Sequence, residues 1–178
     1  MKLRTLALAF ALVACGGDTT NDKPAKETPA KVEKKATPTP KPKPTPPPAV
    51  VAKPDADGVV HIEATDMMKY NANRIEVEGT TVKIELKHVG KMPKNGMGHN
   101  LVVLKPGTNA ISWASGAIAA AATEYIPAGD AAIVAHTKLL GGGDSDTIEF
   151  TVPGPGEYPF VCSFPGHAAI MNGVLVVK

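Results

Sequence analysis

The segment CSFPGHAAIM, residues 162–171, lies between two apolar, strand-like runs near the end of the chain. It places the thiol of Cys162, the imidazole of His167 and the thioether of Met171 on one short loop. These donors suit a copper ion that alternates between Cu(I), which prefers sulfur, and Cu(II), which prefers nitrogen. A lone methionine or histidine is usually a packing residue, but this combination between two strands is far more specific. The segment therefore predicts a metal-binding loop at one end of a β-sheet domain.

A second imidazole completes the predicted site. His99, in the sequence GMGHN, precedes the apolar run LVVL, which has the pattern of an interior strand. We expect both histidines and Cys162 to form a trigonal plane around copper, with Met171 as a distant axial ligand. Gly98 has no side chain, so its carbonyl group can approach the metal from the opposite side.

Residues beside the predicted ligands have supporting roles. The amide of Asn100 can link the two ligand loops, while Ser163 and backbone donors near it can hydrogen-bond the thiolate and raise the reduction potential. Phe164 is placed to exclude water from the metal. Apolar residues of the same loop, with Met92 and Met97, are expected to form a flat docking patch of the kind that transient redox encounters use.

The rest of residues 58–178 predicts an all-β domain with a single core. Short runs with period-two alternation dominate it, and Gly-rich and Pro-rich turns separate them, which indicates a β-sandwich or barrel. The clearest runs are 60–64, 75–77, 82–86, 148–152 and 174–177. Residues 108–125, with one Trp and a run of alanines, break this pattern and predict a short helical flap between strands.

The other histidines are not expected to be ligands. Alternation along residues 81–89 puts His88 on the same face as three aliphatic side chains, so it should point into the core. There it is either a hydrogen-bonded core residue or a proton site linked to the redox state of the metal. His61 should face solvent, and His136 has no second ligand near it in the sequence.

The beginning of the chain predicts export. Residues 1–14 combine Lys2 and Arg4 with an apolar stretch that is too short to span a bilayer. The sequence LVAC that ends at Cys15 resembles the bacterial lipobox, in which the cysteine is lipidated and begins the mature chain. We therefore expect Cys15 to anchor the protein to a membrane in the periplasm or outer cell envelope. An ordinary cleaved signal with an incidental cysteine is the alternative.

Residues 15–57 predict a tether. They are rich in Pro, Lys, Thr and Ala and hold most of the chain's 17 prolines. Such a stretch buries too little apolar surface to offset its ordering entropy, so we expect a disordered or polyproline-like spacer. With Cys15 at the anchor and Cys162 in the loop, the 2 cysteines of the chain are not expected to form a disulfide.

The charge distribution excludes one class of function. The formal net charge is only +2, and residues 58–178 contain more acidic than basic side chains. A nucleic-acid-binding protein would show a clustered basic face. We expect no nucleic-acid partner, and a monomer.

These motifs resemble the type 1 blue copper proteins of the cupredoxin family, in particular the azurin group, over most of residues 58–178. The resemblance is dense at residues 93–100, 134–139 and 162–171. The spacing of four residues between Cys162 and His167 is that of the azurin-type loop. Azurins carry a disulfide near the N-terminus that this sequence cannot make, and the lipobox and tether are additions to the soluble form.

The resemblance implies an eight-stranded Greek-key β-sandwich with one copper ion held by His99, Cys162 and His167, and weakly by Met171 and the Gly98 carbonyl. It also implies a one-electron carrier of the periplasm, with His167 as the entry point for the electron. Partners would be redox proteins such as c-type cytochromes, reductases or oxidases, met transiently. Tethering raises the effective concentration near membrane-bound partners.

Other functions use similar donors. A copper oxidase or nitrite reductase would need a second copper site, yet the three remaining histidines show no clustering. Copper storage, delivery or resistance needs exposed and exchangeable ligands, whereas this site is predicted to be closed and rigid. Zinc also binds sulfur and nitrogen donors. An intense thiolate-to-copper charge-transfer band would separate an electron carrier from these alternatives.

Overall fold

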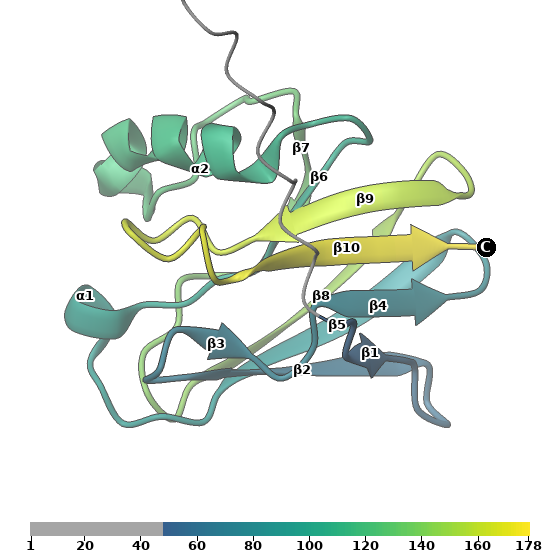
Figure 1. The fold of residues 1–178 in the computed structure, drawn as a ribbon, viewed down its shortest axis with the longest axis horizontal. Helices are drawn as coiled ribbons and strands as arrows, with labels where there is room; N and C mark the ends of the chain where they lie inside the picture. The colour runs from purple at the N-terminus through teal and green to yellow at the C-terminus, as the bar shows by residue number, and fades with distance from the viewer. Residues whose placement is uncertain (1–47) are drawn as a thin grey trace, which may run out of the picture. The chain divides into compact units, whose positions relative to one another are not determined.

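Two β-sheets stacked face to face form the domain in the computed structural model, which describes residues 48–178 (Figure 1). The predicted export signal, Cys15 and most of the predicted tether lie outside the described residues. One sheet has the strand order β3-β2-β5-β8 and the other β1-β4-β10-β9-β6-β7. The first consists of β2 (Val59–Thr65), β3 (Lys69–Tyr70), β5 (Thr81–His88) and β8 (Ser145–Thr151). The second consists of β1 (Val51–Ala52), β4 (Arg74–Val77), β6 (Val102–Leu104), β7 (Ile133–His136), β9 (Gly156–Val161) and β10 (Asn172–Val177).

The all-β sandwich expected from the sequence is confirmed. Strands β1 and β3 have only two residues each, and the longer strands are the eight of the predicted sandwich. Neighbouring strands in a sheet are often distant in sequence: β2 pairs in parallel with β5, and β4 pairs in parallel with β10. The connections therefore cross from one sheet to the other.

Alternation along the strands builds the core. In β5 every second side chain is buried, so Val82, Ile84, Leu86 and His88 face the opposite sheet. Each aliphatic side chain that is fully buried in this way contributes about 1.5–3 kcal/mol relative to an exposed one. Strand β9 adds Tyr158 and Phe160 to the same core.

The predicted helical flap lies between β6 and β7. It consists of α2 (Ala110–Ala117) and a 3₁₀ turn, η1 (Ile118–Thr123). The helix begins at Asn109, whose side-chain oxygen accepts a hydrogen bond from the backbone N–H of Ser112 (2.9 Å), a typical N-cap. Its small residues Ala114 and Ala117 are buried and allow the helix to lie close to the sheet. A four-residue helix, α1 (Lys94–Met97), precedes β6 and was not predicted.

The folded unit begins before the boundary predicted at residue 58. Strand β1 pairs in parallel with β4, and Val51 lies opposite Arg74. The carbonyl of Val50 accepts hydrogen bonds from the N–H groups of Asn73 and Arg74 (both 3.1 Å), and the Val50 N–H donates to the Asn73 side chain (2.8 Å). Backbone pairing holds this short edge strand, and Ala52 packs against the core. Long-range pairing of this kind leaves no signal in composition, which explains why composition assigned the strand to the tether.

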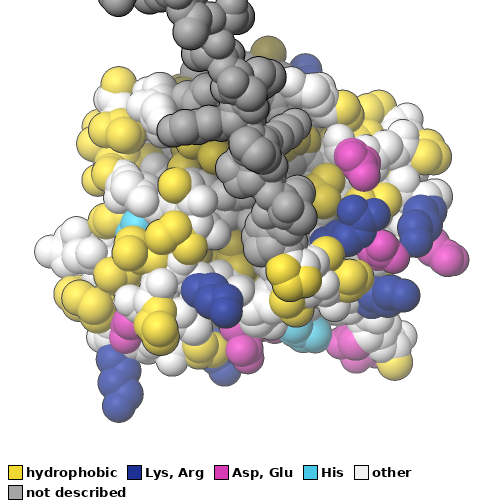
Figure 2. Space-filling model, in the orientation of Figure 1, with side chains coloured by type: hydrophobic (Ala, Val, Ile, Leu, Met, Phe, Trp, Pro, Cys, Tyr) yellow, Lys and Arg dark blue, Asp and Glu magenta, His cyan; other side chains and the backbone are white. Residues whose placement is uncertain are grey.

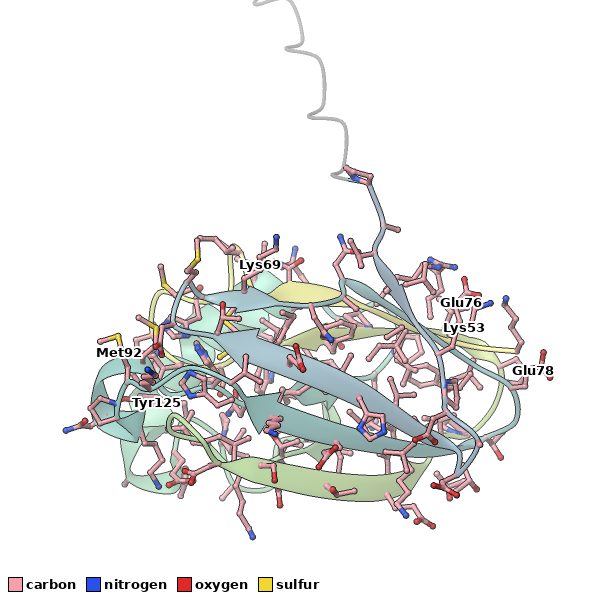
Figure 3. All side chains as sticks on the ribbon, turned by 90° about the horizontal axis from the view of Figure 1, so that it is seen from below. Lys53, Lys69, Glu76, Glu78, Met92 and Tyr125 are labelled. Atoms are coloured by element: carbon pink, nitrogen blue, oxygen red, sulfur yellow. The ribbon has the colours of Figure 1, made fainter. Side chains whose placement is uncertain are left out.

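The two ends of the domain differ in character. Met92 and Tyr125 lie at one end, and Lys53, Glu76 and Glu78 lie at the other (Figure 3). The space-filling view shows hydrophobic side chains gathered toward the end that carries α1 and charged side chains toward the opposite end (Figure 2). Within residues 48–178, the helices are all too short or too polar to cross a membrane.

Candidate metal centre

Three buried side chains converge at the apolar end of the domain. The ligand atoms of His99, Cys162 and His167 all lie within 4.8 Å of one another. Strand pairing explains how they meet: β6 runs antiparallel to β9, with Val102 opposite Val161. Residues that precede β6 and residues that follow β9 must therefore lie at the same end of the sheet. His99 comes from the first group, and the other two ligands come from the second.

Backbone hydrogen bonds close the loop of residues 162–171. The N–H of Cys162 donates to the Met171 carbonyl (2.9 Å), and the N–H of Met171 donates to the His167 carbonyl (2.8 Å). Gly166 supports the turn with a φ of +83°, a conformation that glycine adopts without strain. Met171 is fully buried in the same core cluster as Cys162, so the loop carries its thiol, imidazole and thioether inward.

His99 is oriented by the β2–β3 hairpin. Its Nε2 donates to the Thr65 carbonyl (2.9 Å), which leaves Nδ1 as the unprotonated nitrogen. Nδ1 is buried and has no hydrogen-bond partner. Burial also lowers the pKa of His99 to about 4, so the imidazole is neutral at physiological pH. A neutral ring with an unpartnered buried nitrogen is the form that binds a metal ion.

The Cys162 sulfur lies at the centre of the cluster. It is 3.6 Å from Nδ1 of His167 and 3.9 Å from the carbonyl oxygen of Gly98. Burial raises the pKa of the Cys162 thiol to about 11, although the backbone N–H groups of Asn100 and Phe164 favour the thiolate. A bound metal ion would deprotonate this thiol outright. Burial likewise lowers the pKa of His167, which favours its neutral form.

Asn100 links the two ligand loops. Its side-chain N–H donates to the Ser163 hydroxyl (2.8 Å), and its side-chain oxygen accepts from the Ser163 N–H (2.9 Å). The hydrogen bonds found for Ser163 among the described residues go to Asn100, and the expected bond from its hydroxyl to the sulfur stays a prediction. Burial raises the pKa of the Cys162 thiol, and the backbone N–H groups of Asn100 and Phe164 lower it in part.

Gly98 is required by packing beside the metal centre. A Cβ atom at this position would lie 2.5 Å from the Lys94 carbonyl oxygen and 2.9 Å from Cγ of Leu139. Glycine therefore allows the chain to bring the Gly98 carbonyl toward the Cys162 sulfur.

Aromatic rings cover the side of the cluster that faces outward. The ring of Phe164 lies 4.7 Å from that of His167, and the ring of Tyr125 lies 5.4 Å from that of Phe164. His167 is only 3% exposed under this cover. The arrangement restricts the access of water to the ligands while leaving His167 close to the surface.

The remaining histidines lie where the alternation pattern predicts. His88 is fully buried, with Nε2 3.2 Å from an Asp66 carboxylate oxygen, and its ring contacts that of His99 at 4.4 Å. Nδ1 of His88 has no hydrogen-bond partner among the described residues, so only one of the two ring nitrogens is hydrogen-bonded. His61 is exposed between Asp55 and Glu85. His136 is exposed too and does not join the cluster.

Sequence reasoning missed Tyr70 and Asp66, which both touch the ligand loops from the β2–β3 hairpin. The Tyr70 hydroxyl donates to the Asn100 carbonyl. Burial, followed by the nearby Cys162, raises the pKa of Tyr70 well above its usual value. Asp66 accepts from the N–H groups of Lys91 (2.8 Å) and Met92 (3.1 Å). The only sequence signal for Tyr70 was its place in a short apolar stretch, which does not reveal a contact 30 residues away.

The donor set fits copper. Two neutral imidazoles and one thiol, all buried, converge with an unpartnered nitrogen among them. Such a mixture of nitrogen and soft sulfur suits an ion that uses both Cu(I) and Cu(II). A surface groove at the opposite end, beside Lys53, Glu78 and Lys178, contains none of these donors. The chemistry of the side chains, rather than the size of a hollow, locates the site.

Comparison with known proteins agrees with this geometry. Residues 56–178 match the family described as copper binding proteins, plastocyanin/azurin family. Azurin-2 from Alcaligenes xylosoxydans xylosoxydans is 44% identical over 119 residues, which cover 64% of this chain and 92% of that protein. Azurin from Bordetella pertussis is 42% identical over 125 residues, which cover 67% of this chain and 83% of that protein.

Solved structures show the same fold. Azurin Az-iso2 from Methylomonas sp. strain J superposes with a TM-score of 0.62 at 32% identity, covering 69% of this chain and 99% of that one. Reduced auracyanin from Roseiflexus castenholzii gives a TM-score of 0.61 at 32% identity, covering 70% of this chain and 99% of that one. The chain therefore belongs to the plastocyanin/azurin family of copper-binding proteins, the cupredoxins, which are electron carriers rather than enzymes.

Proposed function

We propose that this protein is a membrane-tethered carrier of single electrons that uses one type 1 copper ion. His99, Cys162 and His167 are the proposed strong ligands, with Met171 and the Gly98 carbonyl as weak ones. The observation that carries the proposal is the convergence of three buried ligand atoms within 4.8 Å of one another. Copper held in such a set would supply the one-electron Cu(I)/Cu(II) couple.

The protein contributes rigidity and exclusion of water. His99 is held by the Thr65 carbonyl, and Asn100 is held by Ser163, so the loops have little freedom to rearrange. Ligands fixed between the preferences of the two oxidation states move little when an electron arrives, which makes transfer fast. The burial of all three ligands also disfavours the ready exchange of metal that storage or delivery would require.

An apolar surface surrounds the proposed entry point at His167. Exposed side chains of the ligand loop and of the loop before α1 contribute to it, including Ile170 (60% exposed) and Met92 (41% exposed). The flap adds Ile111 and Ile118, which line a shallow groove together with Phe164. A patch of this kind suits brief contacts with redox proteins such as c-type cytochromes, reductases or oxidases.

Spectroscopy of the copper-loaded full chain tests the copper site. We expect an intense visible thiolate-to-copper band and an unusually narrow copper hyperfine splitting in EPR. Cys162→Ser should abolish the band and leave the fold largely intact by circular dichroism. A colourless and redox-silent copper complex of the unmodified protein would rule out the carrier function.

Export and lipid anchoring at Cys15 complete the proposal. The support is the sequence of residues 1–15 and the proline-rich stretch that follows it, which lie outside the described residues. Acyl chains on Cys15 would contribute about 0.8 kcal/mol for each buried methylene group. Expression of Cys15→Ser should move the protein from the membrane fraction to the soluble fraction, with the blue site unchanged. Unaltered fractionation would exclude the anchor.

A further inference from the structure

The β2–β3 hairpin holds the loops around the metal centre from the opposite sheet. The Thr65 carbonyl accepts from His99, and the Asp66 carboxylate accepts from two N–H groups of the loop before α1. The third contact is the Tyr70 hydroxyl, which donates to the Asn100 carbonyl. The first contact uses the backbone carbonyl of Thr65, and the second uses the partly exposed carboxylate of Asp66. Tyr70 is different because it places a side-chain hydroxyl inside the core.

The surroundings of Tyr70 fix its hydroxyl in place. The residue is 6% exposed, and its ring packs edge-on against Phe160 with the ring centroids 5.9 Å apart. The peptide group that accepts its hydrogen bond is held at the other end as well, because the Leu101 N–H donates to the Thr137 hydroxyl (3.0 Å). The Asn100–Leu101 peptide is thus clamped between two hydroxyl groups from different parts of the chain.

Asn100 connects the peptide held by Tyr70 to the segment that carries the Cys162 sulfur. Its side chain makes two hydrogen bonds to Ser163, the residue after that cysteine, and, against the larger effect of burial, its backbone N–H lowers the pKa of the Cys162 thiol. Tyr70 therefore influences the thiolate through Asn100, without being a ligand.

We propose that Tyr70 is a positioning residue that raises the reduction potential of the copper centre by holding hydrogen-bond donors against the Cys162 sulfur. This inference rests on the copper site of the proposed function. Hydrogen bonds to a metal-bound thiolate withdraw electron density from the sulfur, which disfavours Cu(II) and so favours the reduced state. The hydroxyl moves no proton and forms no bond to the metal.

The chain offers a matched control in Tyr158. It is 2% exposed, and its hydroxyl donates to the Gly154 carbonyl (2.7 Å), yet it lies in β9 and neither its hydroxyl nor that carbonyl touches the ligand loops. Tyr70→Phe and Tyr158→Phe each remove one hydroxyl and leave one carbonyl without its donor. Both variants should therefore lose stability, Tyr70→Phe the more because its hydrogen bond is buried, and only Tyr70→Phe should affect the copper centre.

The test compares the two variants in the full, copper-loaded chain by voltammetry and visible spectroscopy. Tyr70→Phe should lower the reduction potential and shift the thiolate-to-copper band, while Tyr158→Phe should leave both at the wild-type values. Site-specific incorporation of 3-fluorotyrosine at position 70 makes the hydroxyl a stronger donor without opening a cavity, and it should shift the potential upward. Equal potentials for wild type and Tyr70→Phe would overturn the inference, as would equal shifts in the two phenylalanine variants.

A measurement on metal-free protein separates this inference from the copper proposal. Amide hydrogen exchange at Asn100 and Phe164 should be faster in Tyr70→Phe than in wild type, and unchanged in Tyr158→Phe. Wild-type protein without a blue band would defeat the proposed function but leave this comparison intact. Unchanged exchange at both amides in Tyr70→Phe would show that Tyr70 does not position the donors.

Discussion

At the scale of single residues, hydrogen bonds to neighbouring segments fix His99 and Asn100 at the metal centre. The Nε2 atom of His99 is occupied by the Thr65 carbonyl, so only Nδ1 is available to a metal. Asn100 uses its side-chain amide and its backbone carbonyl to join neighbouring segments. The ligands are consequently arranged before any metal arrives, and their energetics can be tested one at a time.

Asn100→Ala should destabilise the metal-free protein by about 2–4 kcal/mol, because it removes two hydrogen bonds and leaves buried polar groups of Ser163 without partners. Unfolding in guanidinium chloride measures this change. Asn95, exposed on α1, provides the matched control, and Asn95→Ala should stay within about 0.5 kcal/mol of wild type. A loss below about 1 kcal/mol for Asn100→Ala would show that the link between the loops contributes little.

Met171→Leu should keep copper bound and raise the reduction potential, since it removes a weak sulfur donor that helps to stabilise Cu(II). The residue is fully buried, and a swap of similar volume costs less than about 1.5 kcal/mol. Voltammetry and a copper assay measure both effects. Met67→Leu, at an 81% exposed position, should leave the potential unchanged. Loss of copper from Met171→Leu would mean that the thioether is a strong ligand rather than a weak one.

At the scale of elements, the antiparallel pairing of β6 with β9 decides where the site forms. It brings the loop before β6 and the loop after β9 to one end of the sheet, although about 60 residues separate them in sequence. The flap inserted between β6 and β7 then packs on the same side, where its apolar residues extend the surface around His167. Loops carry the ligands, while the strands provide the rigid frame.

A chain that begins at residue 58 should be less stable than one that begins at residue 48 by about 2–4 kcal/mol. Truncation removes β1 and the hydrogen bonds of Val50 to Asn73 and Arg74, and each such bond contributes about 0.5–1.5 kcal/mol. Chemical unfolding of the two fragments, both metal-free, gives the difference. Equal midpoints would show that residues 48–57 add nothing to the folded domain.

At the scale of the whole domain, the separation of an apolar end from a charged end matches a carrier that presents its metal centre to partners (Figures 2 and 3). At the charged end, the side chain of Arg74 and then that of Lys178, 2.9 Å from Glu76, lower the pKa of Glu76 to about 2. Two histidines, the buried His99 and the exposed His61, make the stability of the domain depend on pH, and their contributions have opposite signs.

The metal-free protein should lose stability as the pH falls from about 6.5 through about 4. The pKa of His99 is lowered by burial to about 4, so its contribution is present above the unfolded pKa and is lost on acidification. His61 has the opposite sign. Hydrogen bonds to Asp55 and then to Glu85 raise its pKa, so its contribution is present below the unfolded pKa and is lost as the pH rises through the folded one.

Unfolding of metal-free His61→Gln and wild type, measured at about pH 5.5 and about pH 9, checks these signs. The variant should be less stable than wild type at the lower pH and nearly equal to it at the higher pH. A constant difference between the two proteins across this range would contradict the assignment. Wild-type stability that is flat below about pH 6.5 would contradict the assignment of His99.

The sequence by itself determined the class of fold, the flap and the set of donor residues. Alternation placed the buried faces of β2, β5 and β8 correctly, since a period of two is a local property that neighbouring residues reveal. The loop from Cys162 to Met171 is likewise local, so its chemistry could be predicted before its geometry was known.

Only the tertiary structure decided which distant groups surround those donors. The hydroxyl of Tyr70 reaches Asn100, and the Thr65 carbonyl selects the free nitrogen of His99. The edge strand β1 joins the sheet by pairing with β4. None of these contacts leaves a trace in composition or periodicity, because each depends on how the two sheets are stacked. Local patterns set what each segment buries, whereas long-range packing sets which polar groups meet.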